Sequence, residues 1–276
     1  MDEISDWQDE RLRPYRNLPD RALRDDDGRF IAEGTETVRM LLQSALAVES
    51  VVLKASLAEK LAPDLAARPE VPVYAVEPTL LSQVVGYQVH RGVLACGRRP
   101  ELQRQAALLQ RAQQPGPLRL LLVDAVHDPW NVGGMLRSAR GLGLDAVVLG
   151  PGCCDPFTRR AIRVSVGHVF HQPLVAVDDL PAFIGELLGR EVTCYAGRLS
   201  SDSQPVAGLR PSRRWAVVVG NEDRAVQPAV AACCQPIHIP MAPGVDSLNA
   251  GVSAALLAHA CLLQESHDDT DRWTGS

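Results

Sequence analysis

The second half of the chain alternates short apolar strands with helical patterns, and this alternation limits the possible folds more than any other feature. LRLLLVD (118–124) is a continuous apolar run, which is typical of a parallel strand buried on both faces. Helical patterns at 131–142, 178–189, 226–233 and 248–264 separate it from later strands. The alternation predicts an α/β fold with a parallel sheet and helices on both faces. The later strands expected are DAVVLG (145–150), PLVAV (173–177), EVTCYAG (191–197), WAVVVG (215–220) and PIHIP (236–240).

A smaller α/β unit precedes this domain, over residues 25–97. It combines one amphipathic helix after FIAEG with three short strands and a second helix. Its strands are expected at 51–53, 71–76 and 92–97, and its second helix at 79–86. The first half therefore predicts a separate domain of its own.

Three other segments look less regular. Residues 1–24 are charged and rich in arginine, which predicts an arm that is either solvated or touches RNA. Residues 98–117 are charged, rich in glutamine and end in Pro-Gly-Pro, so we expect a partly helical linker. Residues 266–276 are expected to be a disordered tail, which leaves 118–265 as the second domain.

Charge and composition exclude several classes of protein. A formal net charge of −5 disfavours a generally basic nucleic-acid binder, although a local patch can still bind phosphate. Lys54 and Lys60 are the only lysines, so arginine carries the positive charge. That bias suits phosphate contacts, and a GC-rich genome produces it equally.

Cysteine usage and hydropathy indicate where the chain works. Seven cysteines without zinc-type spacing predict reduced thiols, no metal site and a cytoplasmic protein. The N-terminus has no apolar core of the kind a signal peptide needs, and no apolar run reaches the ~18 residues of a membrane span. We therefore expect no membrane association.

The usual glycine fingerprints of nucleotide-binding folds are missing. No G-x-G-x-x-G follows the first strand of either unit, and no G-x-x-x-x-G-K-[ST] occurs. A nicotinamide- or nucleotide-binding enzyme is therefore disfavoured. Ligands of open α/β sheets still bind at the carboxyl ends of the strands, so the loops there hold the candidate residues.

The first such loop is DAVHDPWNVGGMLRSARGLG. Asn131 stands where a helix starts and can cap it. Gly133 and Gly134 cost roughly 1 kcal/mol each in a helix relative to alanine, which suggests close approach by backbone or ligand. Arg137 and Arg140 share another face, where they are either solvated or form a phosphate clamp.

The second loop is VVVGNEDRAV, residues 217–226. Turn chemistry alone accounts for its Asn, Asp and Gly residues. Glu222 is the residue that turn chemistry explains least, since it follows a strand that ends at Gly220 beside the expected pocket.

The third loop leads into GVDSLNAGVSAALLAH, residues 244–259. Ser247 can cap the helix, and Asn249 has two donors and an acceptor to hold loops or a ligand. We expect Leu248, Val252, Leu256 and Leu263 to form an inward stripe. The helix also has a face of small residues, which predicts close packing against another segment, a partner subunit or a flat ligand: Gly251, Ser253, Ala254, Ala255 and Ala258.

Together the three loops resemble the three motifs of the SpoU/TrmH family of RNA 2′-O-ribose methyltransferases, in the SPOUT superfamily. The motif N-x-G-x-x-x-R-x-A matches residues 131–139, and G-x-E-x-x-G matches 220–225 except for its last glycine. The motif I-P-M-x(5)-S-L-N matches 239–249. Order and spacing agree over 118–265, and residues 25–97 resemble the L30e-like substrate-binding domain of many members.

The resemblance implies a deep trefoil knot in the second domain, an S-adenosylmethionine site, an RNA substrate from ribosomal or transfer RNA, and a homodimer. It also implies roles for individual residues. Those implied for catalysis are Arg137, Asn131, Glu222 and Asn249. Those implied for cofactor binding are Gly197, Gly220, Ile239, Ser247, Leu248 and Asn249. Those implied for RNA binding are Arg137, Arg140 and Arg163.

Two positions depart from the family pattern. Ala225 stands where the second motif ends in glycine, and Ala250-Gly251 stand where Val-Ser usually follows. If position 225 needs a positive φ, alanine strains the turn by roughly 1 kcal/mol. The departures keep one alternative open, a non-catalytic RNA-binding or assembly factor on the same knotted fold.

Overall fold

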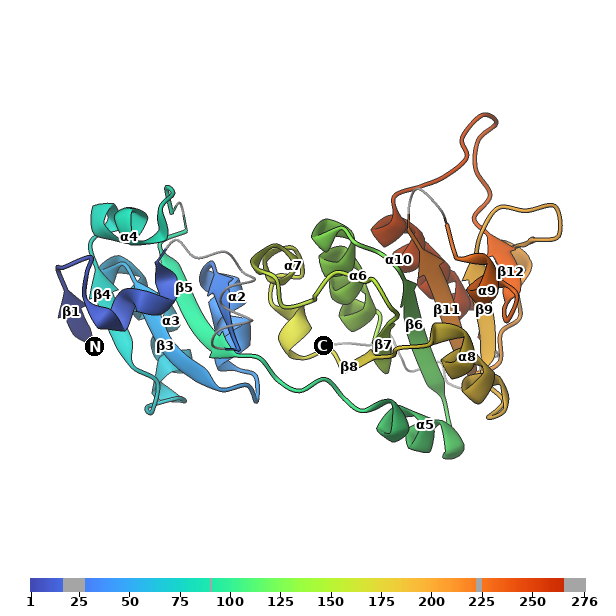
Figure 1. Cartoon of the computed structure of the whole chain (residues 1–276), viewed down its shortest axis with the longest axis horizontal. Coiled ribbons are helices and arrows are strands. Elements are labelled where there is room, and N and C mark those ends of the chain that lie inside the picture. Colours follow the sequence, from blue (N-terminus) through green and yellow to red (C-terminus); the bar gives the residue numbers. More distant parts are fainter. Residues whose placement is uncertain (17–27, 90, 222–224, 266–276) are drawn as a thin grey trace. The chain divides into compact units, whose positions relative to one another are not determined.

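The computed structural model describes residues 1–16, 28–89, 91–221 and 225–265, and the chain divides into two compact units (Figure 1). Unit 1 comprises Met1–Glu101 and Asp155–His171. Unit 2 comprises Leu102–Cys154 and Gln172–Ser276. The division is not a single cut in the sequence, because a short segment of the second half belongs to unit 1.

Unit 2 is built on a seven-stranded sheet in which every pair of neighbours is parallel, in the order β10-β12-β9-β11-β6-β7-β8. The central pair runs in register from Arg214 beside Leu118 to Gly220 beside Asp124. The predicted parallel sheet is thereby confirmed. The strands are β6 (Leu118–Asp124), β7 (Ala146–Leu149), β8 (Leu174–Ala176), β9 (Thr193–Gly197), β10 (Gln204–Pro205), β11 (Arg214–Gly220) and β12 (Gln235–His238).

Helices cover both faces of this sheet, which explains why its strands are apolar throughout. Leu118, Leu120 and Leu122 join a buried cluster with residues of α5, α8 and α9. α6 and α10 contribute nothing to that cluster; they pack on each other and on the sheet, so they cover the opposite face. The helices are α5 (Gln105–Gln113), α6 (Pro129–Gly141), α8 (Leu180–Leu188), α9 (Pro228–Ala231) and α10 (Ala250–Gln264), with the short turn η4 (Val206–Gly208).

Unit 1 has a mixed five-stranded sheet of order β1-β4-β3-β5-β2, with parallel pairing from β1 to β3 and antiparallel pairing from β3 to β2. The strands are β1 (Asp2–Ile4), β2 (Arg29–Glu33), β3 (Val48–Leu53), β4 (Val73–Val76) and β5 (Val93–Arg98). The helices are η1 (Glu10–Tyr15), α2 (Thr35–Leu42), η2 (Ala55–Leu57), α3 (Ala58–Ala66) and α4 (Pro78–Val85). A small α/β domain was predicted here, and its likeness to L30e stays a prediction.

The first sixteen residues are part of this domain, so the prediction of a solvated or RNA-touching arm is wrong for them. β1 pairs with β4, and Ile4, Leu12 and Tyr15 are buried in the core. The Tyr15 hydroxyl donates to the carbonyl oxygen of Ser50 at 2.9 Å and accepts from the amide of Cys96 at 3.1 Å. These three apolar residues are widely spaced among charged ones, so the sequence pattern did not indicate their burial. Residues 17–24 of the predicted arm lie outside the described part.

The segment Asp155–His171 carries α7 (Arg159–Val164) and η3 (His168–Phe170) and packs inside unit 1. The rings of Phe157 and Phe170 both pack against the ring of Phe30, at centroid distances of 5.5 and 5.3 Å. His171 Nε2 contacts the carbonyl oxygen of Met40 at 2.8 Å. The compact units thus differ from the predicted domain 118–265 at this segment, because spacing along the sequence does not reveal which aromatic rings meet.

Three further expectations have different outcomes. The linker 98–117 is partly helical, since α5 lies within it, and from Leu102 onward it belongs to unit 2. The expected tail 266–276 lies outside the described residues, and the deep trefoil knot stays a prediction. Within the described ranges no helix is long and apolar enough to cross a membrane.

Candidate functional site

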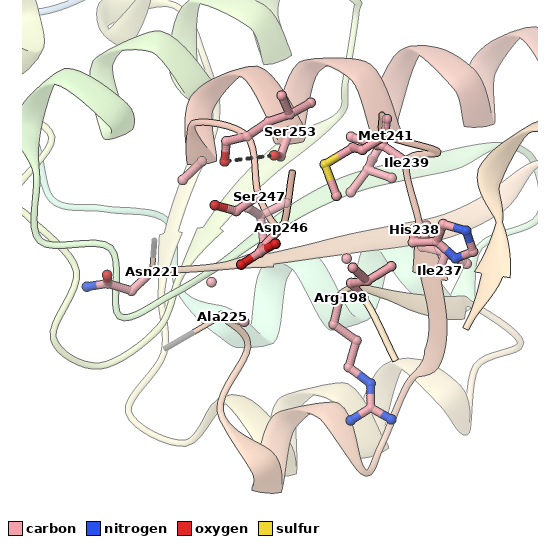
Figure 2. A pocket seen from close by; sticks show the side chains of 17 residues that line it. Arg198, Asn221, Ala225, Ile237, His238, Ile239, Met241, Asp246, Ser247 and Ser253 are labelled. Carbon is pink, nitrogen blue, oxygen red and sulfur yellow. Dashed lines mark hydrogen bonds between the residues drawn. The ribbon is translucent and has the colours of Figure 1, made fainter. Parts of the chain in front are cut away.

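A cavity opens at the carboxyl ends of β9, β11 and β12, where they meet the start of α10 (Figure 2). Its volume is about 660 Å³, including the solvent at its mouth. The lining residues come from four segments: 197–199, 219–225, 237–241 and 246–257. Parallel strands therefore bring to one place loops that are distant in the sequence.

One lining residue, Gly220, must be glycine for the wall to close, and at a second, Gly197, a larger residue would displace a side chain of α10. A Cβ on Gly220 would overlap the backbone of Ala225, because the chain returns directly onto that position. A Cβ on Gly197 would lie 2.6 Å from Leu257 Cδ1 of α10. At both positions the chain packs closely against another segment of the cavity wall.

The return after β11 places Ala225 at a φ of +52°, so the positive φ considered from the sequence is confirmed. Asn221 and Ala225 pair as an isolated antiparallel bridge. Asn221 Nδ2 also donates to the carbonyl oxygen of Ala125 at 3.3 Å. Glu222, for which the family resemblance implies a catalytic role, lies outside the described residues.

Asn131 and Asn249, predicted from different motifs, meet each other. Asn249 Nδ2 donates to Asn131 Oδ1 at 2.7 Å, and Asn249 Oδ1 accepts from the amide of Val252 at 3.2 Å. Asn249 therefore caps α10. A Cβ on Gly251 would lie 3.3 Å from Asn249 Oδ1 and at an ordinary contact distance, 3.5 Å, from the carbonyl oxygen of Asn131, so this crossing of α10 and α6 does not by itself require glycine.

Both helix caps were assigned wrongly from the sequence. Ser247 does not cap α10, because the helix starts at Ala250 and Asn249 occupies the cap position. Asn131 does not cap α6 either; Asp128 does, accepting from the amide of Trp130 at 3.1 Å, with Pro129 as the first helical residue. Asn131 is instead buried inside the helix.

Five of the six residues predicted to bind the cofactor line this one cavity: Gly197, Gly220, Ile239, Ser247 and Leu248. Asn249, the sixth, stands between the lining residues Leu248 and Ala250. Other lining residues were not predicted as site residues: Arg198, His238, Met241, Asp246, Ser253 and Leu257. These residues lie at the ends of β9 and β12, in the loop before α10, and on the face of α10 toward the cavity. Correct bounds for the two strands and a correct phase for the helix could therefore have indicated them.

The predicted RNA-contacting arginines do not line the cavity. Arg137 and Arg140 are exposed on α6, and neither is paired with a carboxylate among the residues that the structure describes. Arg163 belongs to α7 in unit 1, where it is also exposed. An exposed guanidinium remains charged at neutral pH and is available to phosphate.

The expected inward stripe of α10 faces outward, which corrects the predicted helix phase. On the helix, Val252, Leu256 and Leu263 are 48%, 43% and 51% exposed, whereas Leu248, 36% exposed, precedes the helix and lines the cavity. The buried face has one leucine among small side chains instead: Ala250, Ala254, Leu257, Ala258 and Cys261. Close packing against α6 and β11 selects alanines, so the larger apolar residues lie on the surface. Gly134 also differs from expectation, since a Cβ there would meet nothing within 4 Å.

Thiols near the site are neutral and poorly reactive. Burial raises the pKa of Cys153, whose Sγ donates to the carbonyl oxygen of Val123 at 3.2 Å. Burial also raises the pKa of Cys261 in α10 to about 12. A thiolate nucleophile is the reactive form of cysteine, so these residues do not offer one. Across the described ranges, no group of three or more His, Cys, Asp and Glu side chains is arranged to hold a metal ion.

Comparison with known proteins gives the family of this arrangement. A model described as the SpoU rRNA Methylase family matches residues 118–259. A 23S rRNA (guanosine(2553)-2′-O)-methyltransferase of Bacillus subtilis is 28% identical over 260 residues, 94% of this chain and 98% of the relative. An uncharacterized tRNA/rRNA methyltransferase of Mycobacterium tuberculosis is 31% identical over 265 residues, 93% of this chain and 90% of the relative.

Solved structures share the fold over nearly the whole chain. An AdoMet-bound rRNA methyltransferase from Sinorhizobium meliloti superposes with a TM-score of 0.78 at 22% identity, covering 94% of this chain and 96% of that one. The SpoU methyltransferase AviRb from Streptomyces viridochromogenes gives a TM-score of 0.75 at 21% identity, covering 92% and 96%.

Proposed function

Because this chain belongs to the SpoU rRNA methylase family, we propose that it transfers a methyl group from S-adenosylmethionine to a ribose 2′-hydroxyl of ribosomal or transfer RNA. One observation carries the proposal. Residues of the second and third motifs line one cavity, and Asn131 of the first motif, far earlier in the sequence, is hydrogen-bonded to Asn249 beside that cavity.

The cavity fits the cofactor by its chemistry. Ile239, Leu248 and Leu257 supply apolar walls for a flat base, while Gly197 and Gly220 leave backbone groups accessible to its polar edge. When bound, S-adenosylmethionine supplies a methyl group on a sulfonium sulfur. Asn249 holds the start of α10, so Ser247 and Leu248 enter the cavity from a fixed point.

The target side of the site is assigned to α6. Asn131 of α6 orients Asn249 at the start of α10. Arg137 lies later on α6, with its guanidinium exposed. A guanidinium has a pKa above ~12 and is a poor base, so Arg137 grips the RNA phosphate and stabilises developing negative charge on the 2′-oxygen. Arg140 and Arg163 add phosphate contacts, and Glu222 retains its predicted role in organising the loop.

Arginine variants and calorimetry test the activity. Arg137→Ala is expected to reduce methylation of RNA at least ~100-fold, a size typical of one electrostatic group, and to leave the affinity for S-adenosylmethionine unchanged. Arg137→Lys keeps the charge without the bidentate fork, so intermediate activity is expected. Wild-type protein that binds no cofactor at millimolar concentration would favour the non-catalytic RNA-binding factor instead.

A homodimer is also part of the proposal. Val252, Leu256 and Leu263 form an exposed apolar stripe along α10, and a second copy of the same helix would bury it. Light scattering after gel filtration tests this. Leu256→Glu is expected to shift the protein to monomer, whereas Leu188→Glu, an exposed leucine on α8, serves as the control and leaves the mass unchanged. A dimer that survives Leu256→Glu contradicts this interface.

Such an enzyme would work in the cytoplasm, where its RNA substrates are. Ribose-methylation mapping of total RNA from a deletion strain and its parent identifies the modified nucleotide. Sites lost in the deletion strain and restored by the wild-type gene, but not by the Arg137→Ala gene, support the assignment.

A further inference from the structure

Asp124 is a buried carboxylate that none of the roles above uses. It is the last residue of β6 and only 1% exposed. A buried carboxylate is costly unless hydrogen bonds or a cation compensate for lost water. No lysine or arginine in the described part of the chain pairs with it, so its hydrogen bonds carry this compensation.

Both oxygens of Asp124 are bound by one residue. The backbone amide of Gln227 donates to Asp124 Oδ2 at 2.7 Å, and Gln227 Nε2 donates to Asp124 Oδ1 at 2.8 Å. Hydrogen bonds to a charged acceptor are stronger than neutral ones. The pair therefore fixes Gln227, the residue that precedes α9, to the end of the central strand.

The position of Gln227 matters because it follows the cavity wall closely. Gly220, Asn221 and Ala225 all line the cavity, and the backbone of Ala225 occupies the space where Gly220 would carry a Cβ. Ala225 adopts its strained φ of +52° two residues before Gln227. Strained backbone of this kind persists only where the surroundings hold it.

The other end of the wall is held by the neighbouring residue of the same strand end. Ala125, directly after Asp124, accepts from Asn221 Nδ2 at 3.3 Å. The two adjacent residues Asp124 and Ala125 thus bind both sides of the return. They also lead directly into Asp128, the cap of the helix that carries Asn131.

We propose that Asp124 and Gln227 form a clamp that positions Gly220, Asn221 and Ala225 for cofactor binding. The inference rests on the proposed function of the cavity. Asp124 and Gln227 are positioning residues, since neither lines the cavity. Their effect is transmitted through the wall and not through contact with the cofactor.

A charge-exchange experiment tests the clamp by calorimetry with S-adenosylmethionine. Gln227→Glu places a carboxylate against Asp124, and we expect the Kd to rise at least fivefold. Asp124→Asn alone is expected to be mild, because a reoriented Gln227 amide still donates to or accepts from it. The double variant Asp124→Asn/Gln227→Glu restores one donor opposite one acceptor, so its Kd is expected within twofold of wild type.

A matched control separates positioning from general loss of stability. Ile184→Val in α8 removes one methyl group from the core on the far face of the sheet and lowers the overall stability without touching the clamp. Its Kd is expected to equal that of wild type. Failure of the double variant to recover, or an equal rise in Kd for Ile184→Val, overturns the clamp. Absence of binding to wild-type protein would instead overturn the proposed function.

Discussion

The two ends of α10 are held in opposite ways. At its start, beside the cavity, the neutral amide of the exposed Asn249 donates to the buried amide oxygen of Asn131 in α6. Beyond its end, Glu265 forms a buried ion pair with Arg119, with Nε–Oε1 and Nη2–Oε2 distances of 2.6 and 2.7 Å. Trp215 Nε1 also donates to Glu265 at 3.0 Å.

The difference separates anchoring from function in unit 2. The hydrogen bonds of Glu265 join the end of α10 to the amino ends of β6 and β11. The cavity lies at the opposite, carboxyl ends of the strands. The cavity edge has neutral amides, two closely packed glycines, and left-handed alanines at 125 and 225. The stabilising ion pair is therefore at the amino ends of the strands, and the strained backbone is at their carboxyl ends.

The largest expected effect comes from breaking the anchored end. Glu265→Gln leaves the Arg119 charge buried with a neutral partner, and removing one member of a buried pair costs ~3 kcal/mol or more. Urea unfolding followed by tryptophan fluorescence measures the loss. Glu186→Gln breaks the exposed pair with Arg190 and is the control, with an expected loss below ~0.5 kcal/mol. Equal losses for the two variants would remove the contrast between the ends.

An intermediate effect is expected at the cavity end. Asn249→Ala removes the cap of α10 and the hydrogen bond to Asn131, at a cost of ~2 kcal/mol. We expect methyl transfer to fall much further, by at least ~100-fold. Asn249→Asp keeps a capping oxygen and so isolates the loss of the amide donor. The contrast is contradicted if Asn249→Ala destabilises the protein as much as Glu265→Gln while methyl transfer continues.

The smallest effect concerns the strained wall. Ala225→Gly relieves a left-handed φ that costs ~1 kcal/mol for alanine, partly offset by the greater freedom of glycine in the unfolded chain. We expect a gain of ~0.5 kcal/mol by thermal unfolding. Ala229→Gly, on the exposed side of α9, should instead lose ~1 kcal/mol. A loss at both positions would mean that the wall is not strained.

Much of the sheet and the cavity was predictable, and the reason is physical. LRLLLVD could be assigned as a strand because burial on both faces leaves it no polar position, and β6 has the predicted bounds. The loops of the cavity could be located because parallel strands gather their carboxyl ends at one edge.

Most of the errors have another cause, since they depend on contacts between distant segments; the exception is a local signal that was overlooked. The phase of α10 was wrong because alanines, and not leucines, fit against α6. The cap of α6 was misassigned although Asp128 followed by Pro129 is a strong start signal. The burial of Leu12 and Tyr15 depends on β3 and β5, which periodicity in a charged segment does not reveal.

The placement of Asp155–His171 in unit 1 has a consequence for protein engineering. The polypeptide passes between the two units three times, at 101–102, 154–155 and 171–172. A shortened protein that starts at Leu102 would lose Phe30 while keeping Phe157 and Phe170, and would expose both rings to water. The units therefore cannot be exchanged as independent consecutive domains. A graft of a foreign first half must bring its own version of the seventeen-residue segment Asp155–His171.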